Sequence, residues 1–143
     1  MMYEMNNEII KAKNILIKNN YTCVIYSNEK EYHSTLRGVK PLIQFLESDN
    51  DFNEFYAADK VVGAGAAHLY VLLGVKAVWA NIISDSAKTI LQNNNISVFY
   101  ENIVSHIINR TGNGVCPIEK AVFGISDSKQ ALSIIKLTLE KLG

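Results

Sequence analysis

Strand-like and helix-like patterns alternate, with short connections, through the middle of this 143-residue sequence. Residues 55–58, 76–81 and 96–100 are apolar runs of strand length. Between them, residues 61–73 and a segment that starts at Ser84 place apolar residues at helical spacing. Two strands joined through a helix usually lie parallel, because the crossover returns the chain to the same end of the sheet. The middle of the chain therefore predicts a parallel sheet covered by helices.

The segment before this region adds a helix and a hairpin. Residues 7–18 have the spacing of an amphipathic helix, and residues 21–26 and 31–36 are strand-like runs separated by a polar turn. Residues 42–46 fit a short helix. We therefore predict an α/β fold class: a three-layer α-β-α arrangement with a mixed, mostly parallel sheet and an antiparallel hairpin at its edge.

The last third of the chain predicts three helices. Residues 101–109 fit a short helix, and Pro117 is well placed to begin another. Asp127 is followed three residues later by Gln130, which is the spacing of a capping box at the start of the last helix. A chain of this length is expected to form a single domain over residues 1–143.

Charge and cysteine content exclude several classes of partner. Lys plus Arg and Asp plus Glu number 14 each, so we expect no nucleic-acid partner. The longest apolar stretch, residues 69–83, is interrupted by polar residues and predicts no membrane span. Cys23 and Cys116 lie far apart and are expected to be free thiols, as in a reducing compartment. A cytoplasmic protein is therefore expected.

Five short segments, spread over nearly the whole chain, carry a resemblance to a known family. They are Arg37–Leu42, Ala58–Gly63, Leu72–Val78, Ile108–Arg110 and Cys116–Glu119. Together they resemble the bacterial domain of unknown function 1893 family, which is similar in fold to the cytidine-deaminase-like superfamily. The resemblance implies a mixed sheet flanked by helices and implies no particular reaction. Ala64 stands where that family usually has a lysine, so no role for such a lysine carries over.

Zinc deaminases need His-x-Glu at the start of one helix and Pro-Cys-x-x-Cys at the start of another. Three ligands then hold the metal while the glutamate transfers protons. The chain contains neither motif. In a deaminase-like arrangement these helices would begin near Gly63 and Ser84, where the sequence has no zinc ligands. We therefore expect no metal site, no cofactor and no zinc-dependent deamination.

Small residues after the strand at 55–58 suit a ligand site. Gly63 and Gly65 open a helix pattern with unobstructed N–H groups, which favours a phosphate or carboxylate at the helix start. Asp59 and Lys60 end the preceding strand and would face the same crevice. The alternative is that the glycines only let the helix pack closely on the sheet. For Asp59 and Lys60 the alternative is a solvated ion pair or a helix entry.

A second group of candidate residues lies before the last helix. Cys116 directly precedes Pro117, so a helix start there would favour its thiolate, and Glu119 in the first turn would orient a substrate. Asn109 and Arg110 precede a glycine loop, where an arginine can clamp a carboxylate or phosphate. The structural alternatives are a helix cap at Cys116, with Glu119 as an acid that complements the helix dipole, and hydrogen bonds from Arg110 to loop carbonyls.

The leading hypothesis is a small-molecule-binding domain, with a metal-free enzyme using Cys116 and Glu119 as one form of it. Its ligand would be a nucleotide-like or other anionic metabolite, because polar and glycine residues gather at predicted strand ends and loops. The alternative is a catalytically inert interaction or regulatory module that acts through a homodimer surface with aromatics such as Tyr56, Tyr70 or Phe99. A third hypothesis is thiol-based redox sensing at Cys116.

Overall fold

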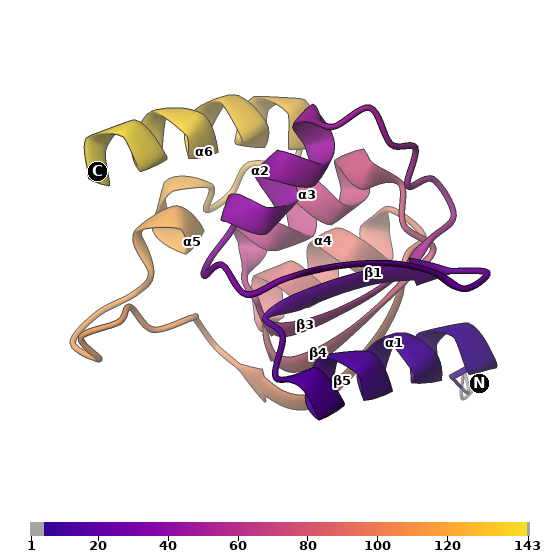
Figure 1. Cartoon of the computed structure of the whole chain (residues 1–143). Coiled ribbons are helices and arrows are strands. Elements are labelled where there is room, and N and C mark those ends of the chain that lie inside the picture. The colour runs from indigo at the N-terminus through magenta and orange to yellow at the C-terminus, as the bar shows by residue number, and fades with distance from the viewer. Residues whose placement is uncertain (1–4, 143) are drawn as a thin grey trace.

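The computed structural model describes residues 5–142 and contains one mixed sheet of five strands (Figure 1). The strands are β1 (Cys23–Ser27), β2 (Lys30–Ser34), β3 (Tyr56–Val62), β4 (Ala77–Ser84) and β5 (Ser97–Val104), in the order β2-β1-β3-β4-β5. β1 pairs antiparallel with both β2 and β3, whereas β3, β4 and β5 run parallel. The predicted α/β class, with a mixed sheet and a hairpin at its edge, is confirmed.

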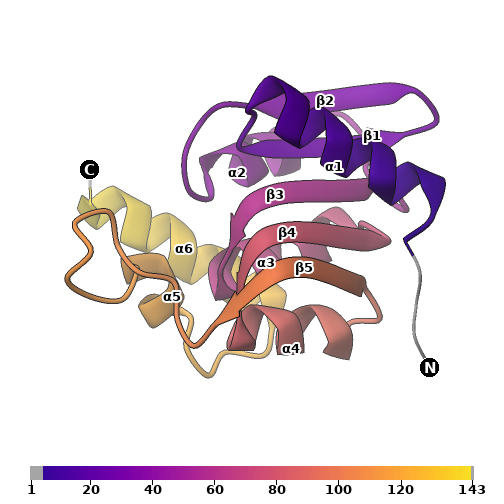
Figure 2. The same ribbon diagram turned by 90° about the horizontal axis from the view of Figure 1, so that it is seen from below.

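Helices cover both faces of the sheet. α1 (Asn7–Asn19) crosses one face, while α2 (Lys40–Glu47), α3 (Ala64–Leu73) and α4 (Asp85–Asn93) lie on the other (Figures 1 and 2). α6 (Ser128–Leu142) packs on the outer side of α3, and the short α5 (Pro117–Ala121) lies beside α3 and α6. α6 therefore adds a partial layer outside the predicted three. Within residues 5–142, no helix has the length and apolar character needed to cross a membrane.

Each face of the sheet has its own apolar core. On one side, Ile9 and Leu16 of α1 pack with Val24 of β1 and Trp79 of β4. On the other side, every residue of α3 from 64 to 70 is buried between the sheet and the helices outside it. A helix enclosed on all sides must consist of small and apolar residues, which accounts for the composition of α3.

The boundary between β3 and α3 differs from the sequence prediction. The helix was expected to start at residue 61, but Val61 and Val62 still belong to β3 and pair with Ile82 and Ile83 of β4. α3 begins at Ala64. Pairing with a long neighbouring strand satisfies the backbone groups of these β-branched residues and outweighs their helical spacing.

The predicted short helix at residues 101–109 is wrong. β5 continues along β4 as far as Val104. The following segment is a loop that is closed by a bridge between Ile108 and Val115. A parallel ladder supplies partners for the backbone of residues 101–104, whereas a helix of about nine residues is marginal without a buried face.

Three other predicted helix starts are confirmed. Ser84 caps α4, since its Oγ accepts a hydrogen bond from Ala87 N–H at 3.2 Å. α5 begins at Pro117. Asp127 caps α6 by accepting a hydrogen bond from Lys129 N–H at 2.9 Å. These ends depend on side chains within three residues of the cap, so local sequence was enough to find them.

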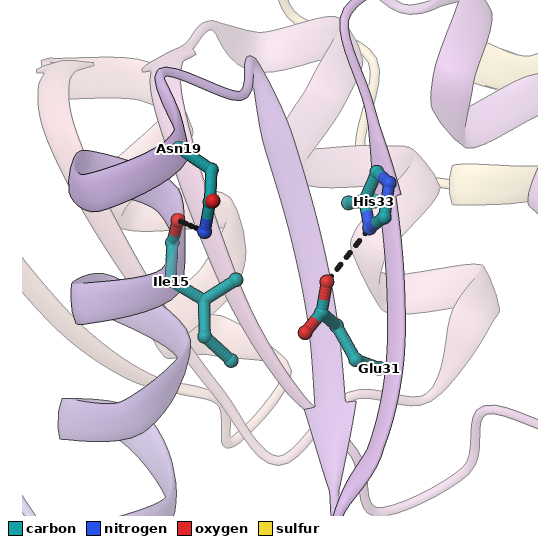
Figure 3. A network of polar contacts seen from close by, with 4 residues as sticks. All are labelled: Ile15, Asn19, Glu31 and His33. Carbon is teal, nitrogen blue, oxygen red and sulfur yellow. Dashed lines mark hydrogen bonds and ion pairs between the residues drawn. The ribbon is translucent and has the colours of Figure 1, made fainter.

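The two edges of the sheet differ in chemistry. β2 carries Lys30, Glu31 and His33, with Glu31 Oε2 and His33 Nδ1 2.7 Å apart (Figure 3). The His33 ring also stacks on Tyr21. The opposite edge strand, β5, has Glu101 as its one charged residue. Because charged side chains on an edge strand oppose pairing with another chain, β2 is protected from such pairing and β5 is not.

Candidate functional site

The carboxyl group of Glu119 lies at the edge of the sheet where β3 and β4 end. Its Oε2 accepts hydrogen bonds from Ala64 N–H at 2.5 Å and from the Ser84 hydroxyl at 2.9 Å. Its Oε1 accepts one from Ile107 N–H at 2.7 Å. Ala64 is the first residue of α3 and Ser84 is the N-cap of α4. One side chain of α5 therefore links the starts of two helices to the loop after β5.

The surroundings of Glu119 suit a negative charge. The residue is only 3% exposed. The amino-terminal ends of α3 and α4 carry partial positive charge from N–H groups that have no partner within the helix. Three donors face the two carboxyl oxygens, so hydrogen bonds offset the loss of water around the group. The sequence predicted an anion at the start of α3, and the structure places an acidic side chain of the chain itself there.

Gly63 and Gly65 allow α5 to approach the start of α3 closely. A Cβ on Gly63 would lie 2.7 Å from Glu119 Oε2 and 3.0 Å from Ile107 Cγ1. A Cβ on Gly65 would overlap Cγ2 of Ile118. The structural alternative proposed for these glycines was close packing. Close packing does occur at both positions, although the neighbour is α5 and its preceding loop rather than the sheet.

A surface pocket of about 550 Å³ lies beside Glu119. It is formed by the loop after β5, by α5 and by the turn that follows α5. Its polar and aromatic lining residues are His106, Asn109, Asn113, Glu119, Lys120 and Phe123. Metabolite sites commonly measure roughly 300 to 1,000 Å³. The pocket is large enough for such a ligand and offers it amide, imidazole, ammonium and aromatic groups.

Asn109 shapes the loop that forms one wall of this pocket. Its Oδ1 accepts hydrogen bonds from Asn113 N–H at 3.2 Å and from the Thr111 hydroxyl at 3.1 Å. Its backbone N–H donates to the carbonyl of Gly114 at 2.8 Å. Asn109 therefore lines the pocket and also determines the conformation of the wall. The neighbouring Arg110 is exposed and lies outside the pocket lining.

Asp59 and Lys60 lie away from this pocket. Asp59 is 8% exposed, and its Oδ2 accepts a hydrogen bond from the Tyr70 hydroxyl at 2.6 Å. The same hydroxyl lies 3.3 Å from Cys23 Sγ, so three polar side chains form a row inside the core. Lys60 instead donates from Nζ to Asn20 Oδ1 at 2.6 Å, beyond the end of α1. Of the first predicted group, only the two glycines reach α5.

Burial raises the pKa values of all three side chains in this row, Asp59, Tyr70 and Cys23. Burial raises the pKa of Asp59 to about 7, because the loss of water disfavours the charged form more than the hydrogen bonds from Tyr70 and Val61 favour it. Burial also raises the pKa of Cys23 and of Tyr70 well above their usual values, and the charge of Asp59 acts in the same direction. Asp59 is therefore the member of the row that titrates near neutral pH.

Cys116 lies at the start of α5 and contributes to the core. Its half-buried side chain packs against the larger apolar cluster. Its backbone N–H donates to the carbonyl of Ile107 at 2.8 Å. Cys116 is outside the lining of the pocket. Its neighbour Val115 does line the pocket, so a role for the Cys116 thiol stays a prediction.

Six of the eight residues that line the pocket were not chosen from the sequence, namely His106, Asn113, Gly114, Val115, Lys120 and Phe123. Lys120 and Phe123 follow Glu119 by one and four residues, so their closeness to a candidate residue was a usable signal. His106 gave no such signal, because residues 101–109 were expected to be helical and its direction was not determined by any local pattern.

His68 is fully buried between α3 and α6 and lies outside the pocket lining. Its Nδ1 lies 2.9 Å from Ser128 Oγ, and its Nε2 has no hydrogen-bond partner among the described residues. Burial lowers the pKa of His68 below its usual value, and the backbone of Ile125 and the charge of Asp127 oppose this only in part. The geometry favours a neutral imidazole that packs between two helices.

The starts of α3 and α4 do not fit a zinc ion. Zinc sites are usually built from nitrogen and sulfur ligands, with four groups around the metal. Here the nearby groups are backbone N–H, the Ser84 hydroxyl and the single carboxyl group of Glu119. Within residues 5–142, no group of three or more His, Cys, Asp or Glu side chains is arranged to hold a metal ion. The donor set fits a hydrogen-bonded carboxylate.

Comparisons with solved structures show two similar proteins. The crystal structure of a DUF1893 family protein from Thermotoga maritima matches 97% of this chain and 92% of that chain, with 25% sequence identity and a TM-score of 0.83. The crystal structure of dCMP deaminase from the cyanophage S-TIM5, in apo form, covers 67% of this chain and 99% of that chain. Its sequence identity is 14% and its TM-score is 0.48.

Comparison at the sequence level gives the family. A search of curated proteins found no match. The model of the family described as domain of unknown function DUF1893 matches residues 11–139, which is most of the chain. The resemblance drawn from five short segments is therefore confirmed. This chain belongs to the DUF1893 family.

Proposed function

We propose that this chain is a small-molecule-binding domain whose ligand occupies the pocket beside Glu119. The observation that carries the proposal is the position of this pocket. It lies next to the carboxyl group that joins the ends of β3 and β4, and ligands of open α/β sheets usually bind outside the carboxyl ends of parallel strands. The volume of about 550 Å³ also agrees with a metabolite-sized ligand.

The lining favours a nucleotide-like or other anionic metabolite with a planar part. Phe123 is 73% exposed, so its ring is free to stack on a heterocycle. Lys120 supplies an ammonium group for a phosphate or carboxylate. Asn109 and Asn113 supply amide groups that can donate to and accept from the edge of a ring. His106 adds a further donor or acceptor at the same rim.

Glu119 acts as a positioning residue in this proposal. Both of its oxygens already accept hydrogen bonds from the protein, and they hold the loop at Ile107 against the start of α3. Cys116 packs against the core, half-buried, rather than in the lining. The proposal is therefore binding of a metabolite, without a catalytic step at either residue.

We expect at least one compound to raise the melting temperature in a panel of nucleotides, nucleobases, sugar phosphates and small carboxylates. A ligand at about 100 times its Kd stabilises by roughly 2.7 kcal/mol, or roughly 5 to 10 °C for a domain near this size. Lys120→Gln and Phe123→Ala should each weaken this ligand about tenfold. Both side chains are exposed, so the unliganded variants should melt like the unchanged protein.

Matched controls lie on α6, away from the pocket. Lys141→Gln removes an exposed ammonium and Leu137→Ala removes an exposed apolar side chain. Both controls should keep the full temperature shift. A panel in which no compound gives a shift would contradict the proposal, and so would a shift that survives both pocket substitutions.

The outer edge of β5 favours a second candidate, an interaction module that forms a homodimer. Ile103 and Val104 are 41% and 36% exposed on a strand with a single charged residue. A second copy that paired with this edge would cover these side chains and satisfy the backbone groups of the edge. The aromatics named from the sequence do not supply this surface, because Tyr70 is fully buried and Tyr56 and Phe99 are partly buried.

If this candidate is right, sedimentation equilibrium should give the mass of a dimer, and Ile103→Lys should give the mass of a monomer. A lysine at the edge would place a charge inside the paired surface. Leu137→Lys, on the exposed side of α6, is the matched control and should remain dimeric. A monomer mass for the unchanged protein at high concentration would reject this candidate.

A further inference from the structure

We propose a second binding site, for an aliphatic carboxylate, in the groove between α2, α3 and α6. The groove has a volume of about 330 Å³. Its floor is made by Ile43 and Leu46 of α2, Leu72 of α3 and Leu132 of α6, and each of these side chains is partly exposed. It shares no lining residue with the pocket beside Glu119. The site is therefore additional to the one in the proposed function.

The rim of the groove is positively charged. Lys129 and Lys136 are seven residues apart on α6, which corresponds to about 10 Å along the helix. Lys136 has a partner, since its Nζ lies 3.9 Å from Glu47 Oε2. Lys129 Nζ has no carboxylate partner within residues 5–142. One free ammonium group therefore stands beside an apolar floor.

The ammonium of Lys129, rather than the start of α6, is the anchor for a negative group. The backbone N–H of Lys129 already donates to Asp127 Oδ1 at 2.9 Å. The Asp127 carboxylate therefore occupies the start of α6, and the backbone N–H of Lys129 is not available to a ligand. A ligand carboxylate at the rim would form an ion pair with the ammonium group of Lys129.

This pattern of one cation and an apolar floor matches an amphiphile with a single negative end. With the carboxylate at Lys129, the alkyl chain would run along Leu132 and Leu72 toward the pair of Lys136 and Glu47. A distance of about 10 Å fits a chain of roughly eight carbon atoms. Sugars and nucleobases fit poorly, because the floor offers them no polar partner. Affinity should therefore increase with the length of the apolar chain.

The test uses octanoate as the probe, with butyrate and 1-octanol for comparison. Each is titrated into the full chain, and binding is followed by the chemical shifts of backbone amides. We expect octanoate to shift amides around Ile43, Leu46 and Leu132. It should bind about two- to fivefold more tightly than 1-octanol, which lacks the charge. It should bind at least about fivefold more tightly than butyrate, which lacks most of the apolar chain.

Two substitutions separate the charge from the groove. Lys129→Gln should weaken octanoate about two- to fivefold and leave 1-octanol unchanged, because only the ion pair is lost. Leu46→Trp should fill the groove and weaken both probes. Lys141→Gln, an exposed lysine on the same helix, is the control and should bind like the unchanged protein. Lys129 is exposed and Leu46 is partly exposed, so both variants should fold, which unchanged amide spectra elsewhere would verify.

Three results would overturn the proposal. The first is the absence of any octanoate-dependent shift at millimolar concentration. The second is an octanoate affinity that does not change in the Lys129→Gln and Leu46→Trp variants. The third is a set of shifts that maps to the turn at Phe123 instead of to α2 and α6. That third result would assign the probe to the pocket beside Glu119 and would leave the groove without a ligand.

Discussion

Replacement of Glu119 by alanine is expected to lower the free energy of unfolding by about 3 kcal/mol. The substitution removes the acceptor of hydrogen bonds from Ala64 N–H, the Ser84 hydroxyl and Ile107 N–H in a buried place. Each buried donor left without a partner costs roughly 1 to 3 kcal/mol, and partial entry of water would offset some of the sum. Urea unfolding of both proteins at neutral pH measures the difference.

Two further substitutions show whether the acceptors cause this loss. Glu119→Gln keeps the shape and one acceptor oxygen but turns an amide NH₂ toward a donor. It should therefore lower the free energy of unfolding by less than Glu119→Ala does. Glu140→Ala, on the exposed side of α6, should change the free energy of unfolding by less than about 0.5 kcal/mol. A loss below about 1 kcal/mol for Glu119→Ala would show that the carboxyl group does not hold the two helix starts together.

The free energy of unfolding is expected to fall by about 3 kcal/mol between roughly pH 5 and pH 8.5 because of Asp59. The folded protein raises the pKa of Asp59 from 3.8 to about 7. Between these values the unfolded chain loses the proton while the folded chain keeps it, so stability decreases as pH rises. Above the folded pKa, Asp59 is charged in the folded protein as well as in the unfolded chain, and the free energy of unfolding falls no further. Denaturant unfolding across this pH range measures the effect.

Asp59→Asn should remove this decline. The amide has the shape of the protonated acid and stays neutral, and it can donate to the Tyr70 oxygen while the Tyr70 hydroxyl donates to Cys23 Sγ. His68 titrates in both proteins, so the difference between the two curves isolates Asp59. Asp49→Asn changes an exposed carboxylate and should retain the full decline. Parallel curves for the unchanged protein and Asp59→Asn would show that Asp59 does not titrate in this range.

The sequence predicted most helices and strands of the fold, but it placed the ends of two strands, β3 and β5, too early. The order of strands and helices followed from the spacing of apolar residues, and helix starts at Ser84, Pro117 and Asp127 followed from local chemistry. Val61 and Val62, however, continue β3, and residues 101–104 continue β5. Each extension depends on pairing with β4. A neighbouring strand of eight residues supplied hydrogen-bond partners that the local pattern did not reveal.

The candidate site was predicted only in part. Glu119, Asn109 and the two glycines were chosen from the sequence, and they lie at or next to the pocket. Asp59 was expected at a crevice because it comes near the end of a strand. Its side chain instead points into the core toward Tyr70. The face of a strand on which a residue lies depends on register, and β3 continues to Val62, two residues past Lys60, where the strand was expected to end.

The sequence by itself determined the α/β class, the hairpin at the edge, the capped helix starts and the membership of the DUF1893 family. These features depend on residues that are close together in the chain. The tertiary structure alone decided that Glu119 meets Ala64, 55 residues away, and Ser84, 35 residues away. A glutamate in the first turn of an isolated helix would interact with that helix and with water. Here the packing of α5 against α3 excludes water, so the same carboxyl group joins two other helices.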